Sequence, residues 1–283
     1  MTTFLVFDDK VGDPIADVLI KRPIDDIEMV ELSKFLLRFG VANDGPCRLI
    51  VSPDSIRPKS VIDRVIEISP ATIEAVGGAG TPLQRGQVYA AYEELISGAM
   101  ELSCDRQYTS LGKLVPLPTQ WLLVRQRLPQ VDVPAFVYGY GPETTDTTGF
   151  DQPIFKSPFD LYGWKPNKRP TGLIWDELVV DRPTGRPLLS YQLGGELVVE
   201  AFDGESVSAR LTESITTLFP IVLDVFAARV GEALWFVGDG SITFAAFSHF
   251  LAGAARSRRF EGIAHTYLLQ SLAILGTPRL GQI

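Results

Sequence analysis

Two apolar, β-branched runs on either side of an Asp-Gly pair limit most strongly what this chain can fold into. The runs cover residues 197–202 and 207–211, and Asp203-Gly204 separates them. Because these two residues tolerate the positive φ values of a tight turn, the pattern is the strongest short hairpin signal. A third apolar run over 188–193 precedes them. We therefore expect an antiparallel sheet here, with Lys156 on a short strand at its entrance.

Apolar runs and helix-like repeats alternate in the first part of the chain. The strands that we expect are 3–7, 47–51 and 72–76, and the helices are 24–38, 60–68 and 87–102. Strands that alternate with helices favour a parallel sheet with helices on its faces. We therefore expect residues 1–115 to form an N-terminal parallel α/β domain.

Prolines mark a boundary after this first part, at Pro116 and Pro118. Beyond it we expect strands at 121–124 and 135–140, a helix that starts at Pro220, a hairpin of 233–237 and 241–247 around Gly238-Asp239-Gly240, and a helical tail over 249–259 and 262–275. The predicted fold class is therefore α/β plus α+β, and the second domain spans residues 116–283.

Composition excludes several classes of function. The chain has 283 residues, of which 46% are hydrophobic and 21% charged, which is typical of globular proteins with room for two domains. A net charge of −8 argues against a nucleic-acid surface. No window reaches the roughly 18 apolar residues that a membrane span needs, and the N-terminus lacks a signal-peptide pattern. The two cysteines, Cys47 and Cys104, lack metal-type spacing, so we expect free thiols and a cytoplasmic location.

Three short motifs follow one another in the middle of the chain. They are Ile154-Phe-Lys156-Ser-Pro158, Tyr191-Gln192-Leu-Gly-Gly195-Glu196, and Gly204-Glu-Ser-Val207-Ser-Ala209. This order resembles the ATP-binding half of the ATP-grasp superfamily, in which a V-V-K-P strand precedes a strand that begins Q-E and a G-x-V-x-A strand. Residues 116–119 are similar to the V-P-x-T junction of that family. The resemblance covers about residues 116–255 and implies an ATP-grasp-like antiparallel sheet with helices.

The resemblance also implies an activity and a site. It implies an ATP-dependent carboxylate–amine or carboxylate–thiol ligase that forms an acyl phosphate, uses ATP and Mg²⁺, and acts on a small-molecule or peptide substrate. Lys156 would hold the phosphates, Ser190, Tyr191 and Gln192 would lie near the adenine, Glu196 near the nucleotide or substrate, and Asp239 would bind the metal.

Each of these residues also has a purely structural interpretation. Lys156 could be a strand-end lysine that extends to water. Tyr191 and Gln192 could be alternating residues of a strand, and Asp239 a turn former.

The sequence departs from the family pattern at two places, which favours a second hypothesis. The phosphate-covering loop, here about 164–172, contains prolines rather than glycines. Ala245 and Phe247 stand where the family carries a Glu and an Asn that bind magnesium. The alternative is therefore a catalytically degenerate ATP-grasp-like binding or scaffold protein. A homodimer is also possible through the apolar residues Leu251, Tyr267, Leu268 and Leu269.

Overall fold

The structure is a computed structural model, and it describes residues 3–43, 47–51, 54–56, 60–65, 68–77, 81–102, 115–139, 149–165, 167, 177–202, 205–238 and 240–274. The chain divides into two units, which are described separately. The first unit is Met1–Leu111 with Arg258–Ile283, and the second is Gly112–Ser257. The domain boundary at residues 115 and 116 stays a prediction.

The first unit contains the expected parallel sheet. β1 (Thr3–Phe7) is the central strand and pairs in parallel with β2 (Ile27–Glu31) on one side and with β6 (Ser60–Asp63) on the other. All five residues of β1 are buried, which explains its continuous apolar sequence. The strand expected at 3–7 is confirmed.

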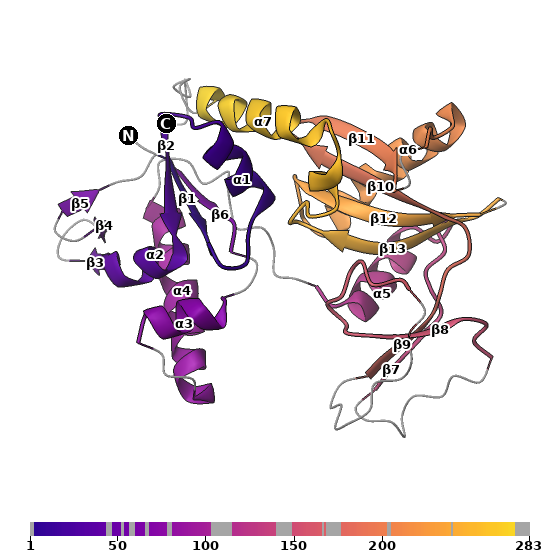
Figure 1. The fold of residues 1–283 in the computed structure, drawn as a ribbon, viewed down its shortest axis with the longest axis horizontal. Coiled ribbons are helices and arrows are strands. Elements are labelled where there is room, and N and C mark those ends of the chain that lie inside the picture. The colour runs from indigo at the N-terminus through magenta and orange to yellow at the C-terminus, as the bar shows by residue number, and fades with distance from the viewer. Residues whose placement is uncertain are drawn as a thin grey trace, which may run out of the picture. The chain divides into compact units, whose positions relative to one another are not determined.

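Helices and a second sheet complete this unit (Figure 1). The helices are α1 (Pro14–Lys21), α2 (Leu32–Arg38), α3 (Pro70–Ala75), α4 (Pro82–Leu102) and α7 (Phe260–Ile274), and the strands are β3 (Phe39–Asn43), β4 (Cys47–Val51) and β5 (Asp54–Ile56). The last three strands pair antiparallel in the order β3-β4-β5. α7 packs against α1, where Lys21 Nζ lies 3.6 Å from Glu261 Oε2. The predictions of a strand at 47–51 and of a helix over 87–102 are confirmed.

Three of the elements predicted in the first unit are wrong. The helix expected over 24–38 begins as strand β2, and only its second half is helical. The helix expected over 60–68 starts as β6, because pairing with the buried β1 overrides the local pattern. The strand expected over 72–76 is largely helix α3, which Ser69 caps by accepting a hydrogen bond from the N–H of Thr72 at 3.1 Å.

A buried ion pair lies at the carboxyl ends of β1 and β6. Asp13 is 2% exposed and caps α1, because its Oδ1 accepts hydrogen bonds from the N–H groups of Ile15 at 3.0 Å and Ala16 at 2.9 Å. Its Oδ2 accepts from Arg64 Nε at 2.8 Å and lies 2.5 Å from Arg64 Nη2. Arg64 is 3% exposed, so this is a buried ion pair.

Asp63 gives the first unit a testable pH dependence. Burial raises the pKa of Asp63 to about 6, although Tyr92 donates a hydrogen bond to its Oδ2 at 2.6 Å. The folded state therefore holds this proton more tightly than the unfolded chain. The stabilisation from the protonated form is complete below about pH 4 and is lost as the pH rises through 6. Relative to wild type, Asp63→Asn is expected to gain about 2–3 kcal/mol of unfolding free energy between pH 4 and pH 7.

Urea unfolding of the wild type and Asp63→Asn at several pH values measures this difference. Asp17→Asn, an exposed change on α1, is the matched control. A wild-type-to-variant difference that is constant from pH 4 to pH 7 would contradict the assignment.

The second unit contains two antiparallel sheets. β7 (Phe136–Gly139), β9 (Glu177–Asp181) and β8 (Pro153–Lys156) form one, in the order β7-β9-β8. The other has the order β11-β10-β12-β13, where β10 is Arg186–Leu193, β11 is Glu196–Ala201, β12 is Gly231–Val237 and β13 is Ile242–Ser248. The strand predicted at 135–140, the short strand that carries Lys156, and the hairpin of 233–237 and 241–247 are confirmed.

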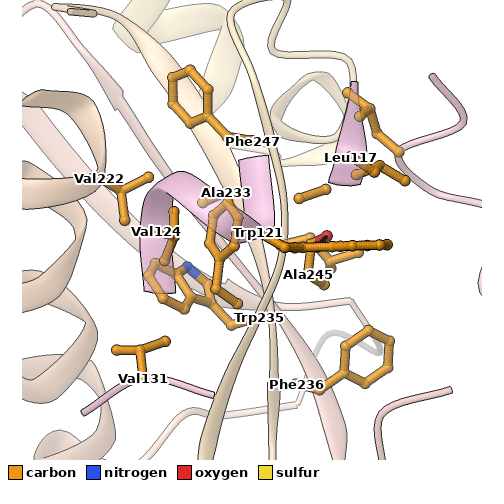
Figure 2. Close-up of a cluster of buried hydrophobic side chains, with 14 of the residues drawn as sticks. Leu117, Trp121, Val124, Val131, Val222, Ala233, Trp235, Phe236, Ala245 and Phe247 are labelled. Atoms are coloured by element: carbon orange, nitrogen blue, oxygen red, sulfur yellow. Dashed lines mark hydrogen bonds between the residues drawn. The ribbon is translucent and has the colours of Figure 1, made fainter. Parts of the chain in front are cut away.

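The main core of this unit lies between the four-stranded sheet and two helices, α5 (Leu117–Arg127) and α6 (Ala209–Val225). Figure 2 shows Trp121 and Val124 of α5 beside Trp235, Ala245 and Phe247 of the sheet, with Val222 of α6 at one side. Trp121 and Trp235 are fully buried. Packing of this kind fixes the sheet on which the family-like motifs lie.

The hairpin predicted around Asp203-Gly204 is wrong. β10 and β11 instead meet at Gly194 and Gly195, whose φ values are 63° and 80°. Residues 207–211 enter helix α6, which Ser208 caps by accepting from the N–H of Leu211 at 3.4 Å. Asp203 and Gly204 lie outside the described residues.

Further elements of the second unit also differ from the predictions. Pro220 lies inside α6 rather than at the start of a helix, and 121–124 belong to helix α5 rather than to a strand. Of the helix predicted at 249–259, only the short 3₁₀ helix η2 (Ala254–Arg256) forms before Phe260 begins α7.

Polar side chains bond to the backbone of one edge strand in each of these two sheets, β13 and β8. Gln120 of α5 accepts from the N–H of Phe247 at 2.7 Å and donates to its carbonyl at 3.0 Å. Trp121 Nε1 donates to the carbonyl of Ala245 at 2.8 Å. On β8, Asn167 accepts from the N–H of Phe155 at 2.9 Å and donates back to its carbonyl. These groups take the place of a neighbouring strand.

No helix in the described part of the chain is long and apolar enough to cross a membrane. Of the four apolar residues on which the homodimer prediction rests, Leu251 and Leu268 are fully buried and Leu269 is 46% exposed. The homodimer stays a prediction.

Candidate functional site

Lys156 ends β8, and its side chain turns into the protein rather than to water. The residue is 8% exposed, and its Nζ has no hydrogen-bond partner among the described residues. The ammonium instead lies 3.8 Å from the ring centroid of Trp164. Arg182 Nε, just after β9, is a second buried donor without a partner in the described part of the chain. A buried cation without a hydrogen-bonded anion is costly, which makes Lys156 the centre of the candidate site.

The environment of Lys156 changes its protonation. Burial lowers the pKa of Lys156 to about 8, and the nearby Asp160 opposes this with a smaller upward effect. The lysine is therefore largely charged at pH 7, but it loses its proton far more easily than a lysine in water. An anion beside Nζ would raise the pKa of Lys156 again.

Residues 157–164, here called the strap, follow Lys156 and carry Trp164. Asp160 Oδ1 accepts from the N–H groups of Gly163 at 2.9 Å and Tyr162 at 3.3 Å, which closes a tight turn. A Cβ atom on Gly163 would lie 1.9 Å from Asp160 Oδ2, so a side chain there would push the carboxylate away. Trp164 Nε1 donates to the carbonyl of Leu161 at 2.7 Å, and the indole packs edge-on against Phe236 at 5.4 Å.

Glu232 fastens the strap to the four-stranded sheet. The hydroxyl of Tyr162 donates a hydrogen bond to Glu232 Oε1. The same carboxylate accepts from the N–H groups of Gly253 at 3.0 Å and Ala254 at 2.7 Å. Burial, followed by the charge of Glu232, raises the pKa of Tyr162 well above its ordinary value, so the phenol stays a donor.

The loop that presents those two N–H groups is strained. Leu251 is fully buried with a φ of 59°, a left-handed conformation that is costly for a branched side chain. The loop therefore has one conformation imposed by its surroundings, with its N–H groups directed at Glu232.

The residues predicted to lie near the adenine do not share one face of the sheet. Ser190 is fully buried, and its Oγ accepts from Trp235 Nε1 at 2.8 Å. Tyr191 is adjacent along the strand and so points to the opposite face, where its hydroxyl donates to Ser257 Oγ at 3.0 Å. Gln192 is half-buried and Glu196 is exposed at the start of β11. Their roles toward a nucleotide stay predictions.

The described residues contain no magnesium site built from protein ligands alone. Asp239, the predicted metal ligand, lies outside the described residues. Ala245 and Phe247 are buried in the core, and their neighbours Ala246 and Ser248 also lack carboxylates. Among the described residues, no group of three or more His, Cys, Asp or Glu is placed to hold a metal. Glu232 is a carboxylate close to this strand, because it lies opposite Ser248 in the sheet. Its oxygens already accept hydrogen bonds from Tyr162 and from the loop N–H groups.

Comparison with known proteins gives a result at the level of structure alone. No family model and no curated protein matches the sequence. The macrocyclase MdnC of Microcystis aeruginosa MRC, bound to its precursor peptide MdnA, superposes with a TM-score of 0.61 at 12% identity, covering 95% of this chain and 100% of MdnC. The ATP-grasp ligase PsnB, with its minimal precursor, Mg and ADP, gives 0.62 at 15% identity and 97% of each chain. The VanG D-Ala:D-Ser ligase of Enterococcus faecalis gives 0.55 at 10% identity, covering 95% of this chain and 98% of VanG.

This chain has an ATP-grasp-like fold. The predicted resemblance and fold class are therefore confirmed, and the fold is the one that ATP-dependent ligases use. The ATP-grasp-like fold extends over nearly the whole chain, including the parallel α/β part, rather than over residues 116–255 alone.

One pocket of the second unit is lined by residues that include Gly240 and Ser241, which follow the predicted metal residue Asp239 in the sequence. Its volume is about 640 Å³, and its lining includes Val131, Arg210, Glu213 and Ile242. None of the described site residues lines it.

Sequence reasoning missed Trp164, Tyr162 and Glu232. Tyr162 and Glu232 are 70 residues apart and meet only after both sheets have formed. The available signal was a carboxylate, Glu232, next to an apolar strand that is otherwise without charge.

Proposed function

We propose that this protein is an ATP-dependent ligase that joins a carboxylate to an amine or a thiol, and that Lys156 binds the phosphates of ATP. The observation that carries this proposal is the buried ammonium of Lys156, which has no hydrogen-bond partner among the described residues. An ammonium in that position gains most from an anion, because the desolvation has already occurred. The ATP-grasp-like fold supports a nucleotide as that anion.

The chemistry of such a ligase has two steps. A carboxylate oxygen attacks the γ-phosphorus of ATP, the bond to the β-phosphate oxygen breaks, and an acyl phosphate and ADP form. The amine or thiol then attacks the carbonyl carbon, phosphate leaves, and the nucleophile gives up its proton. The role of Lys156 is to hold and partly neutralise phosphate oxygens. Magnesium is present in the PsnB complex, but the described residues here bring no three ligands together for it, so no step is assigned to it.

A peptide is the substrate class that the comparisons support best. MdnC and PsnB were both solved with their precursor peptides. We extend this class to the present chain as a proposal, together with a cytoplasmic location.

A second candidate function is favoured by the last hairpin. A binding or scaffold protein with an ATP-grasp-like fold would need no carboxylates there, and residues 245–248 of β13 have none. Such a protein could still bind a nucleotide at Lys156.

Calorimetric titration with ATP, with and without Mg²⁺, tests the proposal. Saturable binding is expected in the wild type, and Lys156→Met is expected to weaken it about 10- to 100-fold, because a charge-assisted hydrogen bond is lost. Lys34→Met, at an exposed lysine of the first unit, is the control. Release of ADP with a peptide carboxylate supports the ligase, and binding without turnover supports the scaffold. Equal ATP affinity in wild type and Lys156→Met would rule out the assigned role of this lysine.

A further inference from the structure

The indole of Trp164 covers the one group to which we assign phosphate binding. We propose that Trp164 acts as an internal substitute for the anion at Lys156, and that an anionic ligand must displace the indole before it can bind. This inference rests on the proposed function and adds a residue that controls access to the site.

The position of the ammonium is the first argument. Lys156 Nζ is buried, so an anion cannot reach it unless a neighbouring group moves. The neighbour in contact with it is the Trp164 ring, whose centroid is 3.8 Å from Nζ. That distance is within the range of a cation–π interaction. The ring therefore supplies negative potential where a phosphate oxygen would supply negative charge.

The ammonium of Lys156 is expected to interact more strongly with a phosphate than with the indole of Trp164. The face of an indole carries only a quadrupole, whereas a phosphate oxygen carries charge and accepts hydrogen bonds from the ammonium. The lowered pKa of Lys156 agrees with incomplete compensation by the ring. The indole thus partly stabilises the buried ammonium when no ligand is bound, and an anion, as a stronger partner, can replace the indole.

The strap allows this movement without unfolding. The Asp160 turn and the bond between Tyr162 and Glu232 hold the backbone on both sides of Leu161. The indole itself is held by one hydrogen bond, from Nε1 to the carbonyl of Leu161, and by ring packing on Phe236 and Trp121. Rotation of the Trp164 side chain breaks those contacts and leaves the anchors of the strap in place.

The competing explanation is that Trp164 is only a core residue. It is 6% exposed, and its ring also lies 6.4 Å from that of Trp121. If Trp164 has only a structural role, replacing it with a smaller side chain is expected to leave the affinity for anions unchanged or to lower it. The two explanations therefore predict opposite changes in affinity.

The experiment compares Trp164→Leu and Trp164→Phe with wild type and with Trp235→Phe, which removes another buried tryptophan of the same unit. Affinity for ATP and for inorganic tripolyphosphate is measured by calorimetry, and tryptophan fluorescence is followed during each titration. Trp164→Leu is expected to bind both anions about tenfold more tightly, because no cation–π contact has to be broken. Trp164→Phe, which keeps a ring and most of the packing, is expected to lie between it and wild type. Wild type and Trp235→Phe are expected to change fluorescence on binding, and the Trp164 variants to lose that change.

Each outcome separates this inference from the proposed function. ATP binding by wild type with unchanged or weaker affinity in both Trp164 variants would overturn the inference and leave the proposed function standing. Binding by the Trp164 variants but not by wild type would support the inference in its strongest form. No binding of either anion by any folded variant would overturn both.

Discussion

Replacing Lys156 with methionine is expected to stabilise the folded protein by about 2–3 kcal/mol at pH 7, although it removes the proposed phosphate-binding group. Burial lowers the pKa of Lys156 from its ordinary value of 10.5 to about 8. That shift corresponds to about 1.4 kcal/mol per pKa unit. The unfolded chain holds the proton more tightly, so the charged lysine favours unfolding. Methionine keeps the apolar stem and has no charge to bury.

The pH dependence of this gain identifies its cause. Below about pH 8 the penalty from Lys156 is complete, and it disappears as the pH rises through 10.5, where the lysine is neutral in both states. The advantage of Lys156→Met is therefore expected to shrink from pH 8 upward. Urea unfolding followed by tryptophan fluorescence measures it, because all four tryptophans lie within residues 112–257.

Lys34→Met, at an exposed lysine, is expected to show no such pH-dependent gain. A Lys156→Met variant that is less stable than wild type at pH 7, or whose gain does not depend on pH, would show that the ammonium is better compensated than its contacts indicate.

Replacing Asp13 with alanine is expected to destabilise the first unit by about 3–5 kcal/mol, the usual cost of breaking a buried ion pair by removing one member. Arg64 is 3% exposed, and both its Nε and its Nη2 contact Asp13 Oδ2. The same change removes the cap of α1, which typically contributes about 1 kcal/mol.

Two further variants separate these contributions. Asp13→Asn keeps an oxygen for the cap but removes the charge, so its loss is expected to approach that of Asp13→Ala. Asp17→Ala, on the exposed side of the first turn of α1, is the control. Because the tryptophans all lie in the second unit, unfolding of the first unit is followed by amide hydrogen exchange of β1 and α1. A loss below about 1 kcal/mol in Asp13→Ala would mean that the carboxylate acts only as a cap.

Sequence patterns predicted those elements whose local signal agrees with their surroundings. The strand β1 and the β12–β13 hairpin were predicted correctly. In both, the apolar residues and the turn residues indicate the structure that burial then favours. Residues 207–211 were predicted wrongly, because the Asp-Gly pair outweighed the Ser208 cap and the helical spacing of Ile215, Phe219 and Val222. Residues 60–63 look helical alone and become a strand only beside β1.

The same distinction holds at the candidate site. Lys156 could be selected from the sequence, because the motif Ile154-Phe-Lys156-Ser-Pro158 resembles the V-V-K-P strand of the ATP-grasp superfamily. Its contact with Trp164 could not, because the turn closed by Asp160 sets the direction of the indole. The opposite directions of Ser190 and Tyr191 follow from strand geometry, but which face carries the core depends on the packing of α5 and α6.

The side chains that bond to the edge strands β13 and β8 have a consequence for how this protein can associate. Gln120 and Trp121 occupy backbone groups of Phe247 and Ala245, and Asn167 occupies those of Phe155. An incoming β-strand from a second copy or a peptide finds those donors and acceptors already used, so it cannot extend either sheet there by main-chain pairing. Recognition at the β13 and β8 edges must therefore rely on side chains, and these two edges offer no template for fibre growth at those positions.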